Sequence, residues 1–326
     1  MRQPWHGWCD MTEPLAHRDR VFVGGGYAWA AATRLLSLDA RTGAIIWQVP
    51  TGGRFSLGRG GLSQRALAAT DDRIVAAVND GLAVYSARDG RLEWSRLVIA
   101  AEWEVTGDAL YVVSAASLFA LDVRSGDERW RVPLAESSSS RPVALGGRVY
   151  VAARGLGAIE TFEALTGKSV ARLGPFPGFN GVLATGGGML LAQAAKDGHP
   201  VTYIVDPIEG RTSVRAALLV GLDGSIAYFS AADGQLEAVD TVSEHTLGTW
   251  SGQLPAHDGG IVVDSNLYYQ RDVRQGMAAI RATDLMTGAR AWSFQTGDIV
   301  KGVTLTADAL YVTSGDCNVY ALRSGR

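Results

Sequence analysis

Four ionisable side chains of the sequence could exchange protons with a small substrate. They are His257, Asp258, Lys301 and Glu102. Imidazole, carboxylate and amine groups are the usual general acids and bases of enzymes, and they can act without a metal. We therefore take these four as the candidate catalytic residues. The chemistry that they favour is that of a cofactor-independent lyase, isomerase or cyclase.

A second set of side chains could hold a ligand by charge, hydrogen bonding or stacking. It consists of Arg65, Trp103, Glu104, Arg141, Asn180, Trp29, Tyr27, His199 and Arg271, with Glu13, Asp272 and Arg274 in the same predicted region. Arg141 or Arg65 would bind an anionic group, because a guanidinium pairs well with carboxylate and phosphate oxygens. For any single member of the set, a solvated surface position is an equally good interpretation.

Motifs for other chemistries are missing from the sequence. The five histidines lack metal-ligand spacing. Thr166-Gly167-Lys168-Ser169 is not a phosphate loop, because Phe162 stands where such a loop needs glycine, and Gly24–Gly26 begins no complete dinucleotide fingerprint. No G-x-S-x-G nucleophile motif occurs. We therefore expect neither a metal nor a cofactor.

A turn motif recurs along the chain and predicts the elements that position these residues. Asp39 to Trp47 reads Asp-x-x-Thr-Gly-x-x-x-Trp, and the copies are 122–130, 284–292, 86–94 and, more weakly, 163–171, 206–214 and 240–248. Successive copies are 34 to 47 residues apart, which is typical of β-propeller blades. In each copy we expect Asp to cap a tight turn and Gly to supply a positive φ, whereas Glu244 replaces this Gly in one copy. The Trp is expected on the outer strand, where it would bridge to the next blade.

An apolar alternating segment precedes each copy of the motif, as half-buried strands require. The segments are Val21–Val23, Ile74–Val78, Leu110–Val113, Val149–Ala152, Met189–Ala192, Ile226–Phe229, Leu267–Tyr269 and Leu310–Thr313. They predict an all-β fold in one domain over residues 1–326, a single eight-bladed β-propeller of four-stranded antiparallel blades. Loops that enter the first strands, and loops that join second to third strands, would share one face. The candidate residues gather there, at the mouth of the central channel.

The turn motif resembles the PQQ-like, quinoprotein-type β-propeller repeat, and the resemblance runs over essentially the whole chain. Lone eight-bladed propellers of the BamB type are similar in shape, which implies a protein-binding scaffold. Their lipid-attachment motif is absent, since His6-Gly7-Trp8-Cys9 has no small residue before the Cys. PQQ dehydrogenases with this repeat are much longer, and many carry an adjacent cysteine pair that this sequence lacks. PQQ itself is therefore not an expected cofactor.

Composition and charge exclude further classes of protein. The net charge is −3 and no run of five like charges occurs, which argues against a nucleic-acid partner. The longest uncharged stretch, residues 173–195, contains six Gly and two Pro, so no membrane span is expected. The N-terminus has no signal-peptide apolar region, which predicts a cytoplasmic monomer. Export, with a leader absent from this numbering, is the alternative.

Two main hypotheses of function stay open. The first is a non-catalytic binding module whose loop-lined channel mouth receives a protein or a small organic ligand, and the second is the enzyme described above. A smaller possibility is an exported sensor domain detached from a larger receptor. An enzyme needs an enclosed pocket with convergent ionisable groups, whereas a scaffold shows an apolar patch or an exposed sheet edge.

The ends of the sequence predict how the ring closes. The repeat from Leu310 to Arg326 contains second and third strands but no outer strand with Trp. We predict that Arg2–Trp8 supply this strand and pair antiparallel with Val319–Leu322. Cys9 would then lie close to Cys317, and a disulfide could form in an oxidising compartment.

Overall fold

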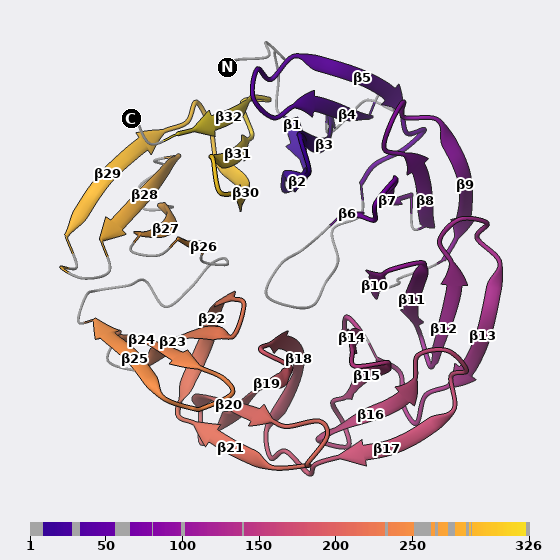
Figure 1. Ribbon diagram of the computed structural model, residues 1–326, viewed down its shortest axis with the longest axis vertical. Helices are drawn as coiled ribbons and strands as arrows, with labels where there is room; N and C mark the ends of the chain where they lie inside the picture. Colours follow the sequence, from indigo (N-terminus) through magenta and orange to yellow (C-terminus); the bar gives the residue numbers. More distant parts are fainter. Residues whose placement is uncertain are drawn as a thin grey trace.

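The chain folds into antiparallel sheets arranged around a central axis, as the computed structural model shows (Figure 1). The structure describes residues 9–27, 33–55, 66–79, 81–98, 102–138, 140–231, 234–250, 262–264, 267–272, 278–284, 287 and 289–323, with backbone alone for 9, 27, 262–264 and 267–272. All regular elements within these ranges are strands, which confirms the prediction of an all-β propeller. No helix able to cross a bilayer occurs in this part of the chain.

Each sheet is built from consecutive strands, which we number in chain order. The first sheet holds β1 (Cys9–Met11), β2 (Leu15–His17), β3 (Arg20–Tyr27), β4 (Arg34–Asp39) and β5 (Ile45–Pro50). The second holds β6 (Leu67–Ala69), β7 (Arg73–Val78), β8 (Gly81–Ser86) and β9 (Leu92–Leu97). The third holds β10 (Glu102–Thr106), β11 (Ala109–Ser114), β12 (Ser117–Asp122) and β13 (Glu128–Pro133). The fourth holds β14 (Val143–Leu145), β15 (Arg148–Ala153), β16 (Ala158–Glu163) and β17 (Ser169–Leu173).

The remaining sheets follow the same order. The fifth holds β18 (Phe179–Gly186), β19 (Met189–Lys196), β20 (His199–Val205) and β21 (Thr212–Arg215). The sixth holds β22 (Ala217–Asp223), β23 (Ile226–Ala231), β24 (Leu236–Asp240) and β25 (Thr246–Trp250). The seventh holds β26 (Val262–Asp264), β27 (Leu267–Asp272), β28 (Ala279–Asp284) and β29 (Arg290–Gln295). The last holds β30 (Val300–Leu305), β31 (Leu310–Ser314) and β32 (Val319–Leu322).

The expected count of eight complete blades is corrected by this topology. Over the described residues, seven sheets have four or more strands and are complete blades, whereas the last sheet has three. The prediction that Arg2–Trp8 complete the last sheet falls outside the described residues. Cys9 itself, at the start of β1, pairs through its backbone with Tyr27 of the first sheet.

The eight apolar segments found in the sequence form the second strands, β3, β7, β11, β15, β19, β23, β27 and β31. Their side chains alternate between the two faces of a sheet and fill the spaces between neighbouring sheets. Val75 and Val84 of the second sheet, for example, share one core with Leu110 and Val112 of the third. The hydrophobic core is therefore divided among the interfaces between sheets.

The turns that begin with Asp have the predicted construction, whereas Ser86 and Glu163 replace this Asp after β8 and β16. The Asp39 carboxylate accepts hydrogen bonds from the Thr42 N–H (2.6 Å) and the Arg41 N–H (3.1 Å), and Gly43 has a φ of 66°. The Thr42 hydroxyl and N–H, in that order, lower the pKa of Asp39. Glu244 adopts the same left-handed conformation, with a φ of 60°, where the other copies have glycine. Asp therefore caps these turns in its charged form.

The motif tryptophans join neighbouring sheets, as the sequence predicts. The indole N–H of Trp47 donates to the Ala87 carbonyl (3.1 Å), that of Trp94 to Val123 (2.9 Å) and that of Trp130 to Ala164 (3.1 Å). Each acceptor stands one residue after the first residue of the next turn motif. Each indole also packs closely against the next motif glycine. A Cβ atom would lie 2.6 Å from the indole ring at Gly90, 2.8 Å at Gly126 and 2.5 Å at Gly167.

Where the motif lacks Trp, other side chains donate a hydrogen bond to the equivalent carbonyl of the next turn. Ala171 replaces Trp on β17, and Arg148 of the fourth sheet donates to the Pro207 carbonyl (3.3 Å). Between the last and first sheets, the Tyr311 hydroxyl (2.9 Å) and the Arg323 guanidinium (2.7 Å) both donate to Ala40. The last sheet is thus joined to the first although its fourth strand is not among the described elements.

Removing one motif indole should destabilise the whole ring. We expect Trp47→Ala to lower the free energy of unfolding by about 3 kcal/mol, because packing against Phe22 and Gly90 and the hydrogen bond to Ala87 are lost together. Trp47→Phe should cost less, because it keeps an aromatic ring. Urea unfolding would measure both. Leu165→Ala is the matched control, since Leu165 is 84% exposed. Equal losses for Trp47→Ala and the control would contradict the structural role of the indole.

The turn carboxylates should make stability fall in acid. Hydrogen bonds from the Ser243 N–H and hydroxyl lower the pKa of Asp240 to about 2. Because the folded pKa lies below the unfolded value of about 3.9, this stabilisation is present above roughly pH 4 and is lost as the pH falls towards 2. We expect Asp240→Asn to flatten the dependence of the melting temperature on pH between 4 and 2. Asp71→Asn, at an exposed position, should leave this dependence unchanged.

Candidate functional site

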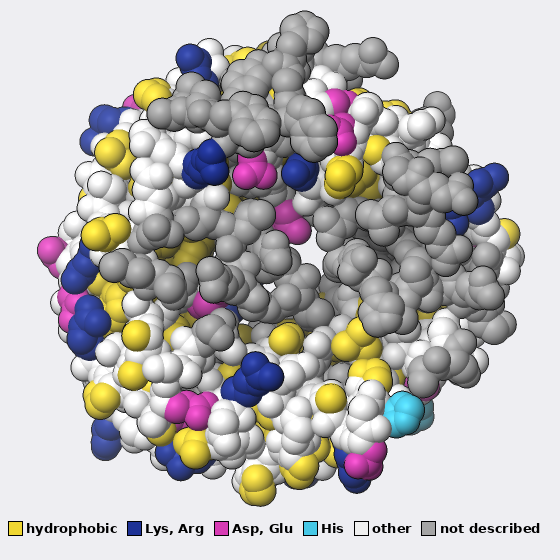
Figure 2. Space-filling view, turned by 180° about the vertical axis from the view of Figure 1, so that it is seen from behind, with side chains coloured by type: hydrophobic (Ala, Val, Ile, Leu, Met, Phe, Trp, Pro, Cys, Tyr) yellow, Lys and Arg dark blue, Asp and Glu magenta, His cyan; other side chains and the backbone are white. Residues whose placement is uncertain are grey.

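The inner strands surround the central opening of the ring, with acidic and basic side chains near it (Figures 1 and 2). Glu102 begins the inner strand β10 and pairs with Val113, next to the turn between β11 and β12. The starts of inner strands and the turns from second to third strands therefore share one end of each sheet. We call this end of the ring the mouth face, and the opposite end, formed by the Asp-Gly turns, the turn face.

An ion pair between neighbouring sheets is the best-defined feature of the mouth face. The Arg141 Nε donates to the Glu104 Oε2 (2.6 Å), and an Nη of the same guanidinium contacts the same oxygen. Glu104 lies on β10, and Arg141 lies two residues before β14. Both side chains are mostly buried. The structure thus brings together two of the predicted ligand-binding residues, and they bind each other.

Trp103, a member of the predicted ligand-binding set, is buried in the structure. Its ring is buried in the core between the second and third sheets, together with Ala68 and Leu82. Side chains alternate along β10, so the position between Glu102 and Glu104 faces the neighbouring sheet. Trp103 is therefore a packing residue.

The two described members of the candidate catalytic set lie on different sheets. Glu102 is buried at the start of β10 in the third sheet. Lys301 is on β30 in the last sheet, and its Nζ lies 3.9 Å from the Asp10 Oδ1 of β1. Glu13 lies beside β30, because its Cα is 2.5 Å from the position that a Cβ atom on Gly302 would occupy. Asp10 and Lys301 form a second ion pair across an interface between sheets.

The other candidates do not complete a site among the described residues. Asn180 is exposed and accepts a hydrogen bond from the Val182 N–H (3.0 Å), which closes a local turn. His199 is exposed at the start of β20. Tyr27, Arg271 and Asp272 have only their backbones described, in β3 and β27. Arg65, Trp29, His257, Asp258 and Arg274 lie outside the described residues.

Sequence analysis did not anticipate a hollow between the fifth and sixth sheets. Val214 and Arg215 line it with Glu237, Glu244 and other residues. Arg215 donates to the Glu237 carboxylate (3.0 Å) and to the Glu244 carbonyl (3.0 Å). The available signal was Val214, which stands four residues after the turn glycine Gly210, where intact motifs have Trp. The hollow is open and its arginine is already paired.

Two ion pairs join adjacent sheets among the described residues of the mouth face. Arg141 neutralises Glu104, and Lys301 lies beside Asp10. Over the described ranges, no three His, Cys, Asp or Glu side chains gather as metal ligands. The geometry on this face therefore consists of ion pairs that bridge adjacent sheets.

Known structures with this architecture differ widely in sequence. BamB from Moraxella catarrhalis has 18% identity to this chain and a TM-score of 0.65, with 95% of this chain and 93% of that chain covered. The computationally designed Ika8 protein has 15% identity and a TM-score of 0.68, with 98% of each chain covered. Quinohemoprotein alcohol dehydrogenase from Comamonas testosteroni has 13% identity and a TM-score of 0.60, with 92% of this chain and 69% of that chain covered. At these identities the similarity shows the fold alone.

A curated relative and a family model match at the level of sequence. The serine/threonine-protein kinase AfsK of Streptomyces griseus is 32% identical over 142 residues, which make up 40% of this chain and 17% of the kinase. The chain therefore spans less than a fifth of that relative. The family model described as outer membrane protein assembly factor BamB matches residues 6–102 and 98–325. Since these ranges cover nearly the whole sequence, the chain belongs to this PQQ-like propeller family of the BamB type.

Proposed function

We propose that the protein is a non-catalytic binding module that docks a partner protein through the turn face of its fourth, fifth and sixth sheets. The observation that carries this proposal is a set of exposed aliphatic side chains at equivalent positions of three consecutive turns. Leu165 is 84% exposed, Ile208 85% and Val242 61%. Each stands two residues after the first residue of its turn motif.

The outer strands of the same three sheets extend this apolar surface. Val170 on β17, Val214 on β21 and Leu247 on β25 are also exposed. The first three sheets instead carry exposed Arg41, Arg88 and Arg124 at the equivalent turn position. Exposed aliphatic side chains also occur on the outer strands of the first two sheets, at Ile46, Leu92 and Leu97, so it is the turn position that distinguishes the fourth to sixth sheets. Exposure of aliphatic side chains to water is unfavourable, and several of them at neighbouring surface positions are typical of a protein–protein contact.

The mouth face supports catalysis less well than the turn face supports binding. Glu104 is committed to Arg141, and the described acid–base candidates Glu102 and Lys301 belong to the third and last sheets. A role in binding other proteins also fits the family's description as an outer membrane protein assembly factor. The match to a kinase favours a second candidate, the sensing domain of a larger signalling protein.

We also propose an oxidising compartment for the protein, in place of the cytoplasmic location expected from the N-terminus. Cys317 is disulfide-bonded, and Cys9 is the other cysteine of the sequence. Such bonds form and persist in exported proteins and are rare in the cytoplasm.

The turn face can be tested with a cross-linking residue. A photoreactive phenylalanine analogue at Ile208, in the cells that make the protein, should yield a discrete adduct with one partner protein. The adduct should disappear when Leu165 and Val242 are both changed to Ser, because the apolar contact is lost. Arg88 is the matched control position on a turn of the second sheet. Equal adducts from both positions would contradict the proposal.

The Arg141→Ala variant tests whether the partner protein binds at the turn face or at the mouth face. This variant should keep the Ile208 adduct, although it should lower the free energy of unfolding by about 1–3 kcal/mol, because it leaves the mostly buried Glu104 carboxylate without its partner. Loss of the adduct in a folded Arg141→Ala protein would place binding at the mouth face. Urea unfolding of the same sample measures the stability.

Measurement of free thiols tests the proposed oxidising compartment. Protein isolated without reductant should show no free thiol until it is unfolded and reduced. Cys317→Ser should lower the free energy of unfolding by up to about 5 kcal/mol, since the bond closes a loop of about 300 residues. Free thiols in freshly isolated native protein would contradict the proposed compartment.

A further inference from the structure

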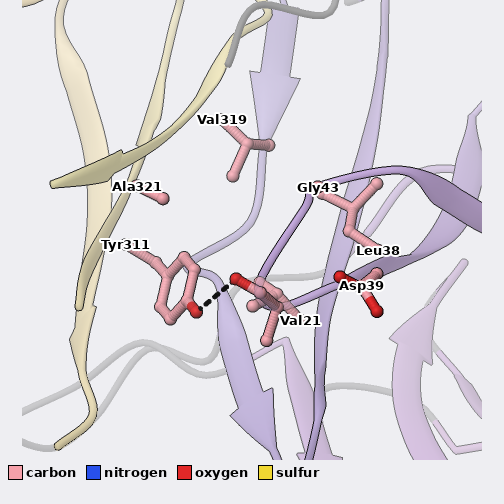
Figure 3. Close-up of a pocket in the computed structure, with 8 residues that line it drawn as sticks. Val21, Leu38, Asp39, Gly43, Tyr311, Val319 and Ala321 are labelled. Atoms are coloured by element: carbon pink, nitrogen blue, oxygen red, sulfur yellow. Dashed lines mark hydrogen bonds between the residues drawn. The ribbon is translucent and has the colours of Figure 1, made fainter. Parts of the chain in front are cut away.

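The hollow between the fifth and sixth sheets is large enough to receive a side chain of another protein. Its volume is about 480 Å³, and its lining includes Val214, Ala217 and Glu237. A second hollow, between the last and first sheets, measures about 20 Å³, and the Tyr311 hydroxyl reaches across one side of it to the Ala40 carbonyl (Figure 3). Of these two hollows, only the one between the fifth and sixth sheets can admit an amino-acid side chain.

This larger hollow exists because the fifth sheet presents no indole to the sixth. In the third sheet, Trp130 lies opposite Ala120, two residues before the Asp of the turn. The residue at that place in the fifth sheet is Ile204, and Ser213 of β21 lies opposite it. A serine fills much less of the gap between sheets than an indole does. The next residue, Val214, is mostly exposed at the edge of the hollow.

An aromatic ring cannot fill the hollow in the place of the missing indole. At three motif glycines, a Cβ atom would lie only 2.5–2.8 Å from the indole that covers the glycine. The residue in the corresponding place of the sixth sheet is Glu244, which has a Cβ atom. An indole in the usual place and this glutamate therefore exclude each other, and the hollow has a carboxylate in its lining instead.

The segment around the hollow is the acidic part of the chain. Residues 206–250 run from the turn of the fifth sheet to the end of the sixth. They contain seven Asp and Glu but only two Arg and no Lys, which gives a net charge of −5 with His neutral. The net charge of the whole chain is only −3, so the remaining residues are slightly basic in sum.

Both arginines of this segment are already paired. Arg215 contacts the Glu237 carboxylate at 3.0 Å, and Arg211 contacts the Asp206 carboxylate at 3.2 Å. Among the residues that the structure describes, three carboxylates of the segment take part in no ion pair, and they belong to Glu209, Asp223 and Glu244. The turn face of the fifth and sixth sheets therefore carries negative charge that the protein itself does not neutralise.

We propose that the partner protein inserts a lysine or arginine side chain into this hollow, from a segment whose neighbouring residues are apolar. The inference rests on the proposed function and names the chemistry of the partner. The aliphatic stem of the basic side chain would lie against Val214, and its cationic group would meet the Glu244 carboxylate. Ile208 and Val242, exposed on the turns of the two sheets that enclose the hollow, would receive the neighbouring apolar residues.

Reversal of the charge at Glu244 tests this inference. With the photoreactive phenylalanine analogue at Ile208, Glu244→Lys should lower the yield of the partner adduct about tenfold, because two cations would meet in the hollow. Mass spectrometry of the cross-linked peptide should find Lys or Arg beside the attachment point. When that residue of the partner is changed to Glu, the yield with Glu244→Lys should be restored.

Two further variants control for charge and for folding. Asp127→Lys makes the same reversal at an exposed position on a turn of the third sheet, and it should change the yield by less than about twofold. Glu244→Gln removes the charge but keeps the shape of the side chain, and it should lower the yield about threefold. It replaces Glu244→Lys if thermal unfolding shows that the lysine variant does not fold.

The outcomes separate this inference from the proposed function. An Ile208 adduct that neither Glu244 variant diminishes, or that Asp127→Lys diminishes equally, would overturn the basic side chain and leave binding at the turn face intact. A cross-linked segment without Lys or Arg, or an adduct between two copies of this chain, would also overturn it. Absence of any Ile208 adduct in the unmodified protein would contradict binding at the turn face, and the basic side chain with it.

Discussion

The ring depends on one repeated hydrogen bond, from a side chain on one sheet to a backbone carbonyl in the turn of the next. Indole N–H groups make it at three consecutive interfaces, through Trp47, Trp94 and Trp130. Arg148 and Tyr311 make it at two others, from second strands. At Ala40, Val123 and Pro207 the acceptor follows a capping Asp, whose carboxylate holds the turn in place, whereas Ala87 and Ala164 follow Ser86 and Glu163. Local turn chemistry therefore sets the geometry between sheets.

Binding at the turn face is compatible with this construction because each turn has two kinds of positions. The Asp, the Gly and the carbonyl that follows the Asp are used inside the protein. The side chain two residues after the first residue of the motif points to solvent, as the exposure of Leu165 and Ile208 shows. Sequence change at that position alters the surface without disturbing the contact between sheets. The repeat can thus present arginine in one half of the ring and aliphatic groups in the other.

The sequence predicted the parts of the fold that local chemistry determines. The second strands, the capped turns and the bridging tryptophans were all recognised, because period-2 apolarity and the motif report directly on backbone conformation. The mouth residues were predicted less well, since a pair such as Glu104 and Arg141 forms only when two sheets meet. Trp103 lies in a core between two sheets, because one step along a strand reverses the face of the side chain. Seven complete blades and a three-stranded last sheet replaced eight equal blades, because only three strands of the last sheet occur among the described residues.

The contact between the fifth and sixth sheets is made by a charged side chain and not by an indole. Val214 is mostly exposed there, and a guanidinium spans the gap to Glu237 and Glu244 beside an open hollow. Charged contacts of this kind weaken as salt screens them, whereas packed indoles do not. The contribution of this contact to the stability of the ring therefore depends on salt concentration, whereas the contribution of the indole contacts does not.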